Sequence, residues 1–201
     1  MTTNETFFYR EPAHYEAIRN VLIPELAKQR QSTRKLSFWS SASSSGQEAY
    51  SLVMLLLDLG YGGWDLEIVG TDICGTAIER AQKGRYLHIE VSRGLPAACL
   101  VKYFRRAGSE WEIAEEVRRR VHFRRIDLRD SMLGMGPFDA IFCRNVMIYF
   151  DAPTRHKILT EMRSVLRKGG WLLLGGAEAA VGTDKLYERL ATGNAVVYVG
   201  K

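Results

Sequence analysis

The stretch that decides the fold runs from Leu36 to Leu59 and reads LSFWSSASSSGQEAYSLVMLLLDL. Its first seven residues, LSFWSSA (36–42), form a short run with aromatic and small side chains, which predicts a buried strand. The small residues that follow lead into an apolar segment of helical length over 46–59, which Gly60 closes at its carboxyl end. A strand, a loop and a helix in this order predict the first unit of an α/β fold.

The rest of the chain repeats this pattern. Further strands are predicted at Leu66–Asp72, Phe138–Arg144, Trp171–Leu174 and Ala195–Val199. A short helix that ends near Gly84 follows the first of these strands. A longer helix begins at Asp151 with Pro153 in its first turn, and Gly169 and Gly170 are predicted to end it. Alternating strands and helices predict a mostly parallel sheet with helices on both faces.

Two segments depart from this alternation. Residues 1–34 are predicted to form an N-terminal arm with a helix that Pro24 kinks or restarts, followed by the main domain at 35–201. Within that domain, the turn at Gly108-Ser109 lies between two short runs that are typical of an antiparallel hairpin. We therefore expect a small β subdomain at approximately residues 86–120, inserted into the α/β unit.

Composition limits the class of protein. The chain has 201 residues, of which 46% are hydrophobic and 25% charged, so one domain with one substantial core is expected. No apolar run reaches the roughly 18 to 20 residues of a membrane helix, and the start, MTTNETFFYR, does not resemble a secretory signal. The three cysteines are odd in number and widely spaced, which favours a reducing cytoplasm. The net charge of +5 favours an acidic partner, either nucleic acid or an acidic protein surface.

Several polar residues follow predicted strands at one edge of the sheet. The serine-rich loop allows a ligand to approach the backbone and the amino end of a helix. Asp72 ends the second strand, where a carboxylate can accept hydrogen bonds from both hydroxyls of a ribose or cap the next helix. Asn145 and Tyr149 follow a further strand and are either ligand contacts or ordinary turn and packing residues. Together these positions indicate a nucleoside-cofactor site.

Two further observations concern the chemistry of that site. Arg10, near the amino end, can bind a carboxylate with its forked guanidinium group, although it can also be a plain surface residue. The four histidines are dispersed and show no ligand spacing, so no metal site is expected.

The chain resembles the CheR-type chemotaxis receptor glutamate methyltransferases over nearly its whole length. The resemblance is carried by six segments in the family's order: MTTNETFFYR (1–10), FWSSASSSGQEAYSL (38–52), VGTDI (69–73), RGLP (93–96), FDAIFCRNVMIYFD (138–151) and RKGGWLLLGGAE (167–178). It implies an α/β fold with a Rossmann-like class I methyltransferase sheet and a small inserted antiparallel β subdomain. It also implies transfer of a methyl group from S-adenosyl-L-methionine to receptor glutamates, with S-adenosyl-L-homocysteine as the product.

The resemblance also assigns roles to individual residues. The methionine amino end is expected at Glu48, the ribose at Asp72 and the transferring methyl group near Arg10 and Tyr149, which are the expected catalytic residues. The full set of implied cofactor contacts is Asn4, Thr6, Arg10, Glu48, Asp72, Asp127, Leu128, Arg144 and Asn145. The implied partner is the cytoplasmic domain of a methyl-accepting chemotaxis receptor, with no nucleic acid and no membrane insertion.

Three departures from the family pattern stand out. Ser43, Ser44 and Ser45 replace the usual Ala, Cys and Thr, and Ala49 replaces a proline. Asp127 replaces the usual asparagine, which removes an amide donor and adds a charge. The family usually carries a further helical domain before the block at which this chain begins. Two alternative functions remain: a nucleic-acid methyltransferase, and a non-catalytic sensor of the cofactor or its product.

Overall fold

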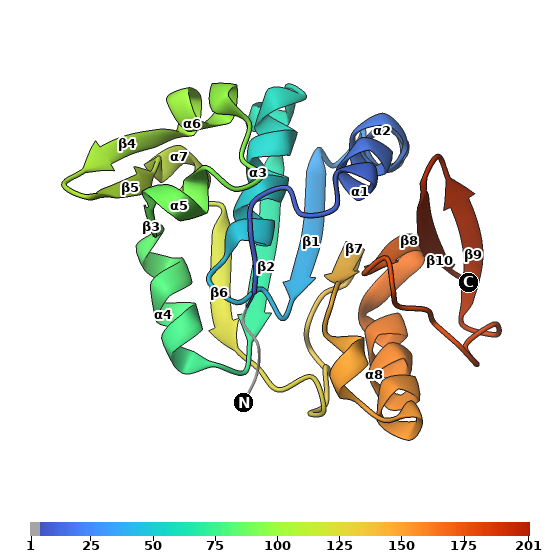
Figure 1. Cartoon of the computed structure of the whole chain (residues 1–201). Helices are drawn as coiled ribbons and strands as arrows, with labels where there is room; N and C mark the ends of the chain where they lie inside the picture. The colour runs from blue at the N-terminus through green and yellow to red at the C-terminus, as the bar shows by residue number, and fades with distance from the viewer. Residues whose placement is uncertain (1–4) are drawn as a thin grey trace.

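A computed structural model describes residues 5–201. Its central sheet has seven strands in the order β6-β2-β1-β7-β8-β10-β9, and β10 runs antiparallel to both of its neighbours, β8 and β9 (Figure 1). The strands are β1 (Lys35–Ser41), β2 (Asp65–Asp72), β6 (Val121–Arg125), β7 (Phe138–Cys143), β8 (Leu166–Leu174), β9 (Tyr187–Thr192) and β10 (Ala195–Gly200). The parallel strands β6, β2, β1, β7 and β8 end at one edge, where the segments that follow them meet.

The predicted α/β class is confirmed, and the five strands predicted for the main sheet correspond to β1, β2, β7, β8 and β10. The two strands that the sequence did not reveal, β6 and β9, lie at the two edges of the sheet. Their sequences are VHFRR and YERLAT, and most of their side chains are exposed. An edge strand carries charged residues because one side of it faces water, so it lacks the apolar run that identifies a central strand.

Helix α8 (Ala152–Val165) begins as predicted, because Asp151 Oδ1 accepts a hydrogen bond of 2.9 Å from the backbone N–H of Thr154. The predicted end of this helix at Gly169 and Gly170 is wrong. The helix ends at Val165 and the chain passes directly into β8, which contains both glycines. Gly169 has a φ of +72°, and the pairing of β7 with β8 shifts register nearby. The glycines therefore mark an irregularity within a strand instead of a helix end.

Helices cover both faces of the sheet, as the alternation along β1 illustrates. Phe38 packs into a core that includes buried residues of α3 (Gln47–Asp58) and α4 (Gly75–Lys83). Its neighbour Trp39 packs into a second core with the buried face of α8. Successive residues of a strand point to opposite faces of the sheet and pack into different cores. β1 and β7 are therefore buried on both faces.

The N-terminal arm consists of α1 (Pro12–Ala17), a π-helical turn (Ile18–Leu22) and α2 (Ile23–Gln29). The predicted interruption at Pro24 takes the form of this turn, in which the N–H of Ile23 bonds to the carbonyl of Ile18. Proline lacks the N–H that a regular helix requires, and the wider turn accommodates it. The apolar side of the arm belongs to the same core as α3. The division between residues 34 and 35 stays a prediction.

The predicted hairpin is confirmed as β4 (Phe104–Ala107) and β5 (Glu110–Ile113), and β3 (Arg85–Leu87) adds a third strand that was not predicted. The short helices α5 (His88–Val91), α6 (Ala97–Tyr103) and α7 (Glu115–Arg118) accompany this small sheet (Figure 1). Phe8 packs edge-on against Tyr86 and Phe104, with ring centroids 5.0 and 5.6 Å apart. The inserted sheet is thereby attached to the segment that precedes α1.

Candidate cofactor site

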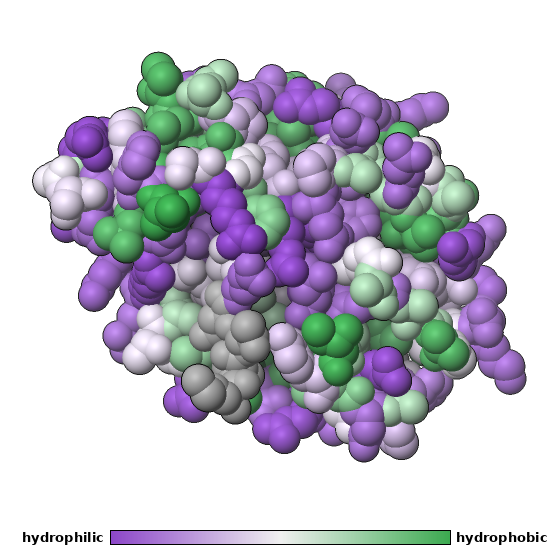
Figure 2. Space-filling model, in the orientation of Figure 1, coloured by the Kyte–Doolittle hydropathy of each residue, from purple (hydrophilic) through white to green (hydrophobic). Residues whose placement is uncertain are grey.

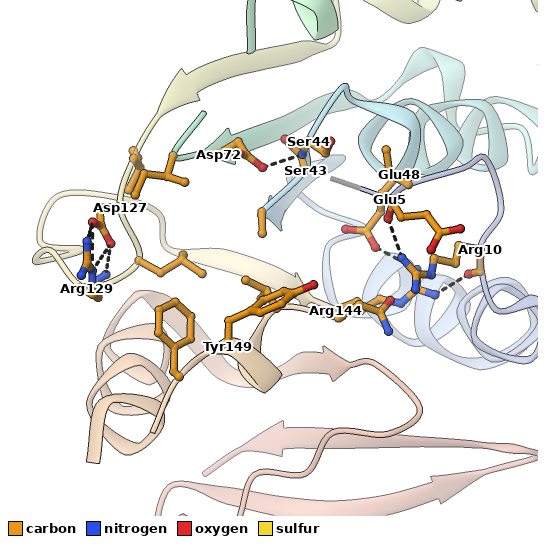
Figure 3. Close-up of a pocket in the computed structure, with 18 of the residues that line it drawn as sticks. Glu5, Arg10, Ser43, Ser44, Glu48, Asp72, Asp127, Arg129, Arg144 and Tyr149 are labelled. Carbon is orange, nitrogen blue, oxygen red and sulfur yellow. Dashed lines mark hydrogen bonds and ion pairs between the residues drawn. The ribbon is translucent and has the colours of Figure 1, made fainter. Parts of the chain in front are cut away.

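A cavity of about 310 Å³ lies at the carboxyl edge of the parallel strands. Its wall comes from the segment before α1, the loop after β1 and the ends of β2, β6 and β7 (Figure 3). Among the residues that the resemblance assigned to the cofactor or to catalysis, those that line it are Thr6, Arg10, Glu48, Asp72, Asp127, Leu128, Arg144, Asn145 and Tyr149. Asn4 lies outside the described residues. Positions from five separate segments therefore meet at one cavity.

The loop between β1 and α3 has an unusual backbone. Ala42, Ser44 and Gly46 all adopt a positive φ, of 55°, 48° and 92°. At Gly46 an added Cβ would lie 2.8 Å from the ring of Phe123, so only glycine fits there. The tight path brings the loop's backbone to the cavity wall, and Ser43 N bonds to Thr71 O at 2.8 Å to hold it against β2.

Asp72 is fixed by two backbone groups. Its Oδ2 accepts from Ser44 N and its Oδ1 accepts from Cys74 N, both at 2.8 Å. The carboxylate thus binds the backbone of the segment that leads to α4 and also lines the cavity. It does not cap α4, whose N-cap residue is Cys74, and the ribose contact stays a prediction. Each carboxylate oxygen has two lone pairs, and one on each oxygen remains for a ligand.

The inner end of the cavity is a network of buried charges. The side chain of Arg144 is only 2% exposed, and its Nη1 lies 2.9 Å from Glu48 Oε2. Its Nη2 lies 3.3 Å from Glu11 Oε2 and also donates to the carbonyl of Arg10. Glu48 Oε1 accepts a further bond of 2.7 Å from the hydroxyl of Ser40. Because each charge has a partner of opposite sign, the ion pairs compensate in part for the hydration that these side chains lose on burial.

Two glutamates that the sequence analysis did not single out organise this end. Glu11 has a left-handed backbone, and its carboxylate lies 2.8 Å from His14 Nδ1 and accepts from Asn145 Nδ2 and Gly176 N, each at 3.2 Å. The hydrogen bond from His14, then the charge of Arg144 and the amide of Asn145, lower the pKa of Glu11 to about 2. This carboxylate therefore stays charged and ties the N-terminal arm to the loop after β7.

Glu178 holds the loop after β7 in its conformation. It accepts from the backbone N–H groups of Gly175, Asn145 and Met147, all at 2.7 Å. Asn145 has a φ of 58°, a conformation that these bonds stabilise. Glu178 closes the GGAE segment, and a glutamate after two glycines was the signal available in the sequence.

Arg10 and Tyr149 lie on opposite segments at the cavity wall. Arg10 Nη1 donates to the carbonyl of Glu5 at 2.8 Å, and its guanidinium lies 5.5 Å from the centroid of the Phe7 ring. Tyr149 ends a short 3-10 helix (Met147–Tyr149) and is 53% exposed. Figure 3 shows Tyr149 between the Asp127 end and the Arg10 end of the cavity.

The outer end of the cavity carries a different kind of ion pair. Asp127 and Arg129 are two positions apart, and Arg129 Nη2 lies 2.5 Å from Asp127 Oδ2. The hydrogen bonds from Arg129 lower the pKa of Asp127. Leu128, between them, is buried. The extra charge that Asp127 brings, compared with an asparagine, is therefore neutralised within the same loop.

Within residues 5–201, no cluster of three or more His, Cys, Asp or Glu side chains is arranged to hold a metal ion. No helix in this part of the chain is long and apolar enough to cross a membrane.

The arrangement suits an elongated ligand with a sugar at its centre and a charged group at one end. Asp72 provides acceptors for a diol, and the inner end provides both a carboxylate and guanidinium groups for a zwitterion. Ser43, another residue of the cavity wall, is buried, and its Oγ has no hydrogen-bond partner within residues 5–201. The residues present thus fit an amino-acid-substituted nucleoside. The fold and the site define a class I methyltransferase that uses S-adenosyl-L-methionine.

Comparison with known proteins agrees with this class and narrows it. Residues 4–196 match the family described as CheR methyltransferase, SAM binding domain, and the chain belongs to that family. The protein from Pseudomonas putida named chemotaxis protein methyltransferase Cher2 is 38% identical over all of this chain and 75% of its own length. A chemotaxis protein methyltransferase from Borreliella burgdorferi is 31% identical over 92% of this chain and 68% of its own.

A solved structure supports the fold. The PH0226 protein from Pyrococcus horikoshii matches with a TM-score of 0.51 over 93% of this chain and 91% of its own, at 17% sequence identity. At that identity the match concerns the fold alone.

Proposed function

We propose that this protein transfers a methyl group from S-adenosyl-L-methionine to glutamate side chains of chemotaxis receptors, which yields glutamate methyl esters and S-adenosyl-L-homocysteine. The observation that carries this proposal is that Tyr149 lines the cavity and is also 53% exposed, so a carboxylate of another protein can reach the cavity beside it. Relatives named chemotaxis protein methyltransferase, 37–38% identical over the whole chain, support a receptor as the acceptor.

We assign the proposed contacts by matching each polar group of the cofactor to a group of the cavity wall that can bind it. The free lone pairs of Asp72 accept the two ribose hydroxyls, Glu48 faces the amino group and Arg10 faces the carboxylate or the substrate. The remaining contacts that we propose are Thr6, Asp127, Leu128, Arg144 and Asn145, which line the cavity, together with Asn4, which is outside the described residues.

The chemistry places modest demands on the protein. When bound, the cofactor supplies a methyl group on a sulfonium, which is already a good leaving group. A glutamate carboxylate has a pKa near about 4.3 and is ionised at pH 7, so no side chain has to act as a general base. The chain's own residues have to align the two reactants and exclude water, and alignment can lower a barrier by roughly 7 to 11 kcal/mol in favourable cases.

Arg10 and Tyr149 are the residues that we expect to orient the substrate carboxylate. Substitutions Tyr149→Phe and Arg10→Ala should each lower turnover about 10- to 100-fold, the effect of one lost hydrogen bond to a charged group. Tyr149→Phe should leave the affinity for S-adenosyl-L-homocysteine unchanged. The matched control is Tyr61→Phe, which changes a tyrosine in the turn that precedes β2, at the opposite edge of the sheet. If both site variants kept normal turnover, these roles would be wrong.

The proposed partner is the cytoplasmic part of a methyl-accepting receptor, and we accordingly propose a cytoplasmic location. The face in Figure 2 is largely hydrophilic, with small and separate hydrophobic patches. The chain's net charge of +5 suits an acidic receptor surface. We also propose the division into an arm at 1–34 and a domain at 35–201 with an inserted subdomain near 86–120.

The deciding experiment measures the transfer of labelled methyl groups from S-adenosyl-L-methionine to receptor-containing membranes, followed by mild alkali. A glutamate ester releases its label in alkali, whereas a methylated amine retains it. Alkali-labile label on the receptor supports the proposal. Cofactor binding without labelling would favour the sensor alternative, and label that enters added RNA in place of the receptor would favour the nucleic-acid alternative.

A further inference from the structure

The loop between α5 and α6, residues 92–96, contains the RGLP block of the sequence and lies against the segment that precedes α1. Arg93 Nη2 lies 2.7 Å from Glu5 Oε1, and its guanidinium lies over the ring of Phe7, 4.4 Å from the centroid. Gly94 has a φ of +80°, and an added Cβ there would clash with the carbonyl oxygen of Phe8. Only glycine allows this approach, so the loop contacts both the backbone and the side chains of the segment.

The guanidinium of Arg10 contacts the same two residues that Arg93 holds. Its Nη1 donates to the carbonyl of Glu5 at 2.8 Å, and the group lies over the Phe7 ring, 5.5 Å from the centroid. The hydrogen bond and charge of Arg93, with a smaller contribution from the charge of Arg10, lower the pKa of Glu5. Glu5, Phe7 and Arg10 line the cavity, and Arg93 supports them from the inserted subdomain.

We propose that Arg93 is a positioning residue for methyl transfer, which holds Arg10 at the cavity through Glu5 and Phe7. This inference rests on the proposed function, since it takes Arg10 as the residue that orients the substrate carboxylate. A long side chain such as that of arginine has many rotamers, and a displacement of about 1 Å at a reacting group can cost a large part of the rate. Arg93 therefore limits the positions that the Arg10 guanidinium adopts.

The contacts of Arg93 suit this role because they do little for the fold. Both side chains of the ion pair between Arg93 and Glu5 are 55% exposed, and exposed ion pairs contribute little to the free energy of unfolding. Loss of Arg93 should therefore lower turnover without unfolding the protein. A residue that touched the substrate directly would instead act independently of Arg10.

The first test measures the transfer of labelled methyl groups to receptor-containing membranes. Arg93→Ala should lower kcat about three- to tenfold, which is less than the loss expected for Arg10→Ala, and Arg93→Lys should recover part of it through the ion pair with Glu5. The affinity for S-adenosyl-L-homocysteine, measured by titration calorimetry, should stay within about threefold, because the groups at the inner end of the cavity are unchanged.

A double-mutant cycle distinguishes positioning from direct action. If Arg93 acts through Arg10, then Arg93→Ala should change kcat by less than about twofold in the Arg10→Ala protein. A full three- to tenfold loss in that background would overturn the positioning role. Lys35→Ala is the control, because it removes an exposed ion pair with Glu67 at the opposite edge of the sheet, and it should leave turnover unchanged.

Hydrogen exchange tests the same inference without turnover. The backbone amides of residues 5–10 should exchange about threefold or more faster in Arg93→Ala, while those of α8 stay unchanged. Equal exchange in the two proteins would overturn the role of Arg93. So would normal turnover of Arg93→Ala beside reduced turnover of Arg10→Ala, and the proposed function would then stand. Absence of labelling by the unsubstituted protein would overturn the proposed function itself.

Discussion

The two ends of the cavity stabilise charge in opposite ways. At the inner end, Arg144 is 2% exposed and binds carboxylates that come from the start of α1 and from α3. At the outer end, Arg129 is 61% exposed and binds a carboxylate two residues earlier in the same loop. The inner network depends on the whole tertiary structure, whereas the outer pair depends on one loop. Substitutions at the inner end should therefore lower the free energy of unfolding. Substitutions at the outer end should weaken cofactor binding with little effect on the free energy of unfolding.

Arg144→Met should have the largest effect on the protein. Removing the arginine leaves Glu48 and Glu11 without their shared partner, and uncompensated buried charges cost about 3 to 5 kcal/mol. We expect the free energy of unfolding, measured in urea, to fall by about that amount, and cofactor binding to be lost.

Adding Glu48→Gln to that variant provides the control, since it removes one of the two carboxylates that lose the arginine and should restore part of the stability. A decrease of less than about 1 kcal/mol in Arg144→Met would show that the inner network does not stabilise the fold.

Glu11 makes the stability of the inner end depend on pH. Its pKa in the folded protein is lowered to about 2, first by the hydrogen bond from His14. A lowered pKa stabilises the fold above the unfolded value of about 4.3, and this contribution is lost as pH falls toward about 2.

Glu11→Gln should therefore destabilise the protein at pH 7 by at most about 3 kcal/mol, and the difference should decrease below about pH 4 and vanish only as the pH falls through about 2. Urea unfolding at a series of pH values measures it. A difference between the two proteins that stays constant from pH 7 to pH 3 would contradict the lowered pKa.

The difference between local and distant contacts also explains which parts of the fold and the site could be predicted from the sequence. The central strands were predictable because they are buried on both faces, and Asp72 was predictable because it ends such a strand. Glu11 and Glu178 were not predicted, since their partners lie more than 130 and 30 positions away in the sequence, at Asn145. A local pattern carries no information on contacts over such separations, although Glu178 also binds the N–H of Gly175 within its own GGAE segment. The pairing of Asp127 with Arg129 is local, yet its orientation at the cavity emerged only from the fold.

Gly175→Ala tests the inner end through the backbone. A Cβ at this position would lie 2.7 Å from Asn145 Nδ2 and 2.8 Å from Glu178 Oε2, both closer than real contacts allow. Glu178 would have to release part of the loop after β7, so we expect a loss of about 1 to 3 kcal/mol in unfolding free energy and weaker cofactor binding.

Gly193→Ala is the control, because it makes the same glycine-to-alanine change at a position away from the cofactor site. Gly193 has a positive φ, and no atom lies within 4 Å of its added Cβ among the residues described. Any decrease in the free energy of unfolding of Gly193→Ala should come from backbone strain alone. Its cofactor binding should be unchanged. Equal binding defects in the two variants would show that close packing at Gly175 does not position the cofactor site.

Arg129→Ala should have the smallest effect on stability. Exposed ion pairs contribute about 0 to 1 kcal/mol, so its free energy of unfolding should stay within about 1 kcal/mol of the unsubstituted protein, while its affinity for S-adenosyl-L-homocysteine falls. The same measurements on Arg144→Met should show both quantities reduced. If Arg129→Ala unfolded as readily as Arg144→Met, burial would not be what separates the two ends, and the outer pair would have to be counted as part of the structural framework.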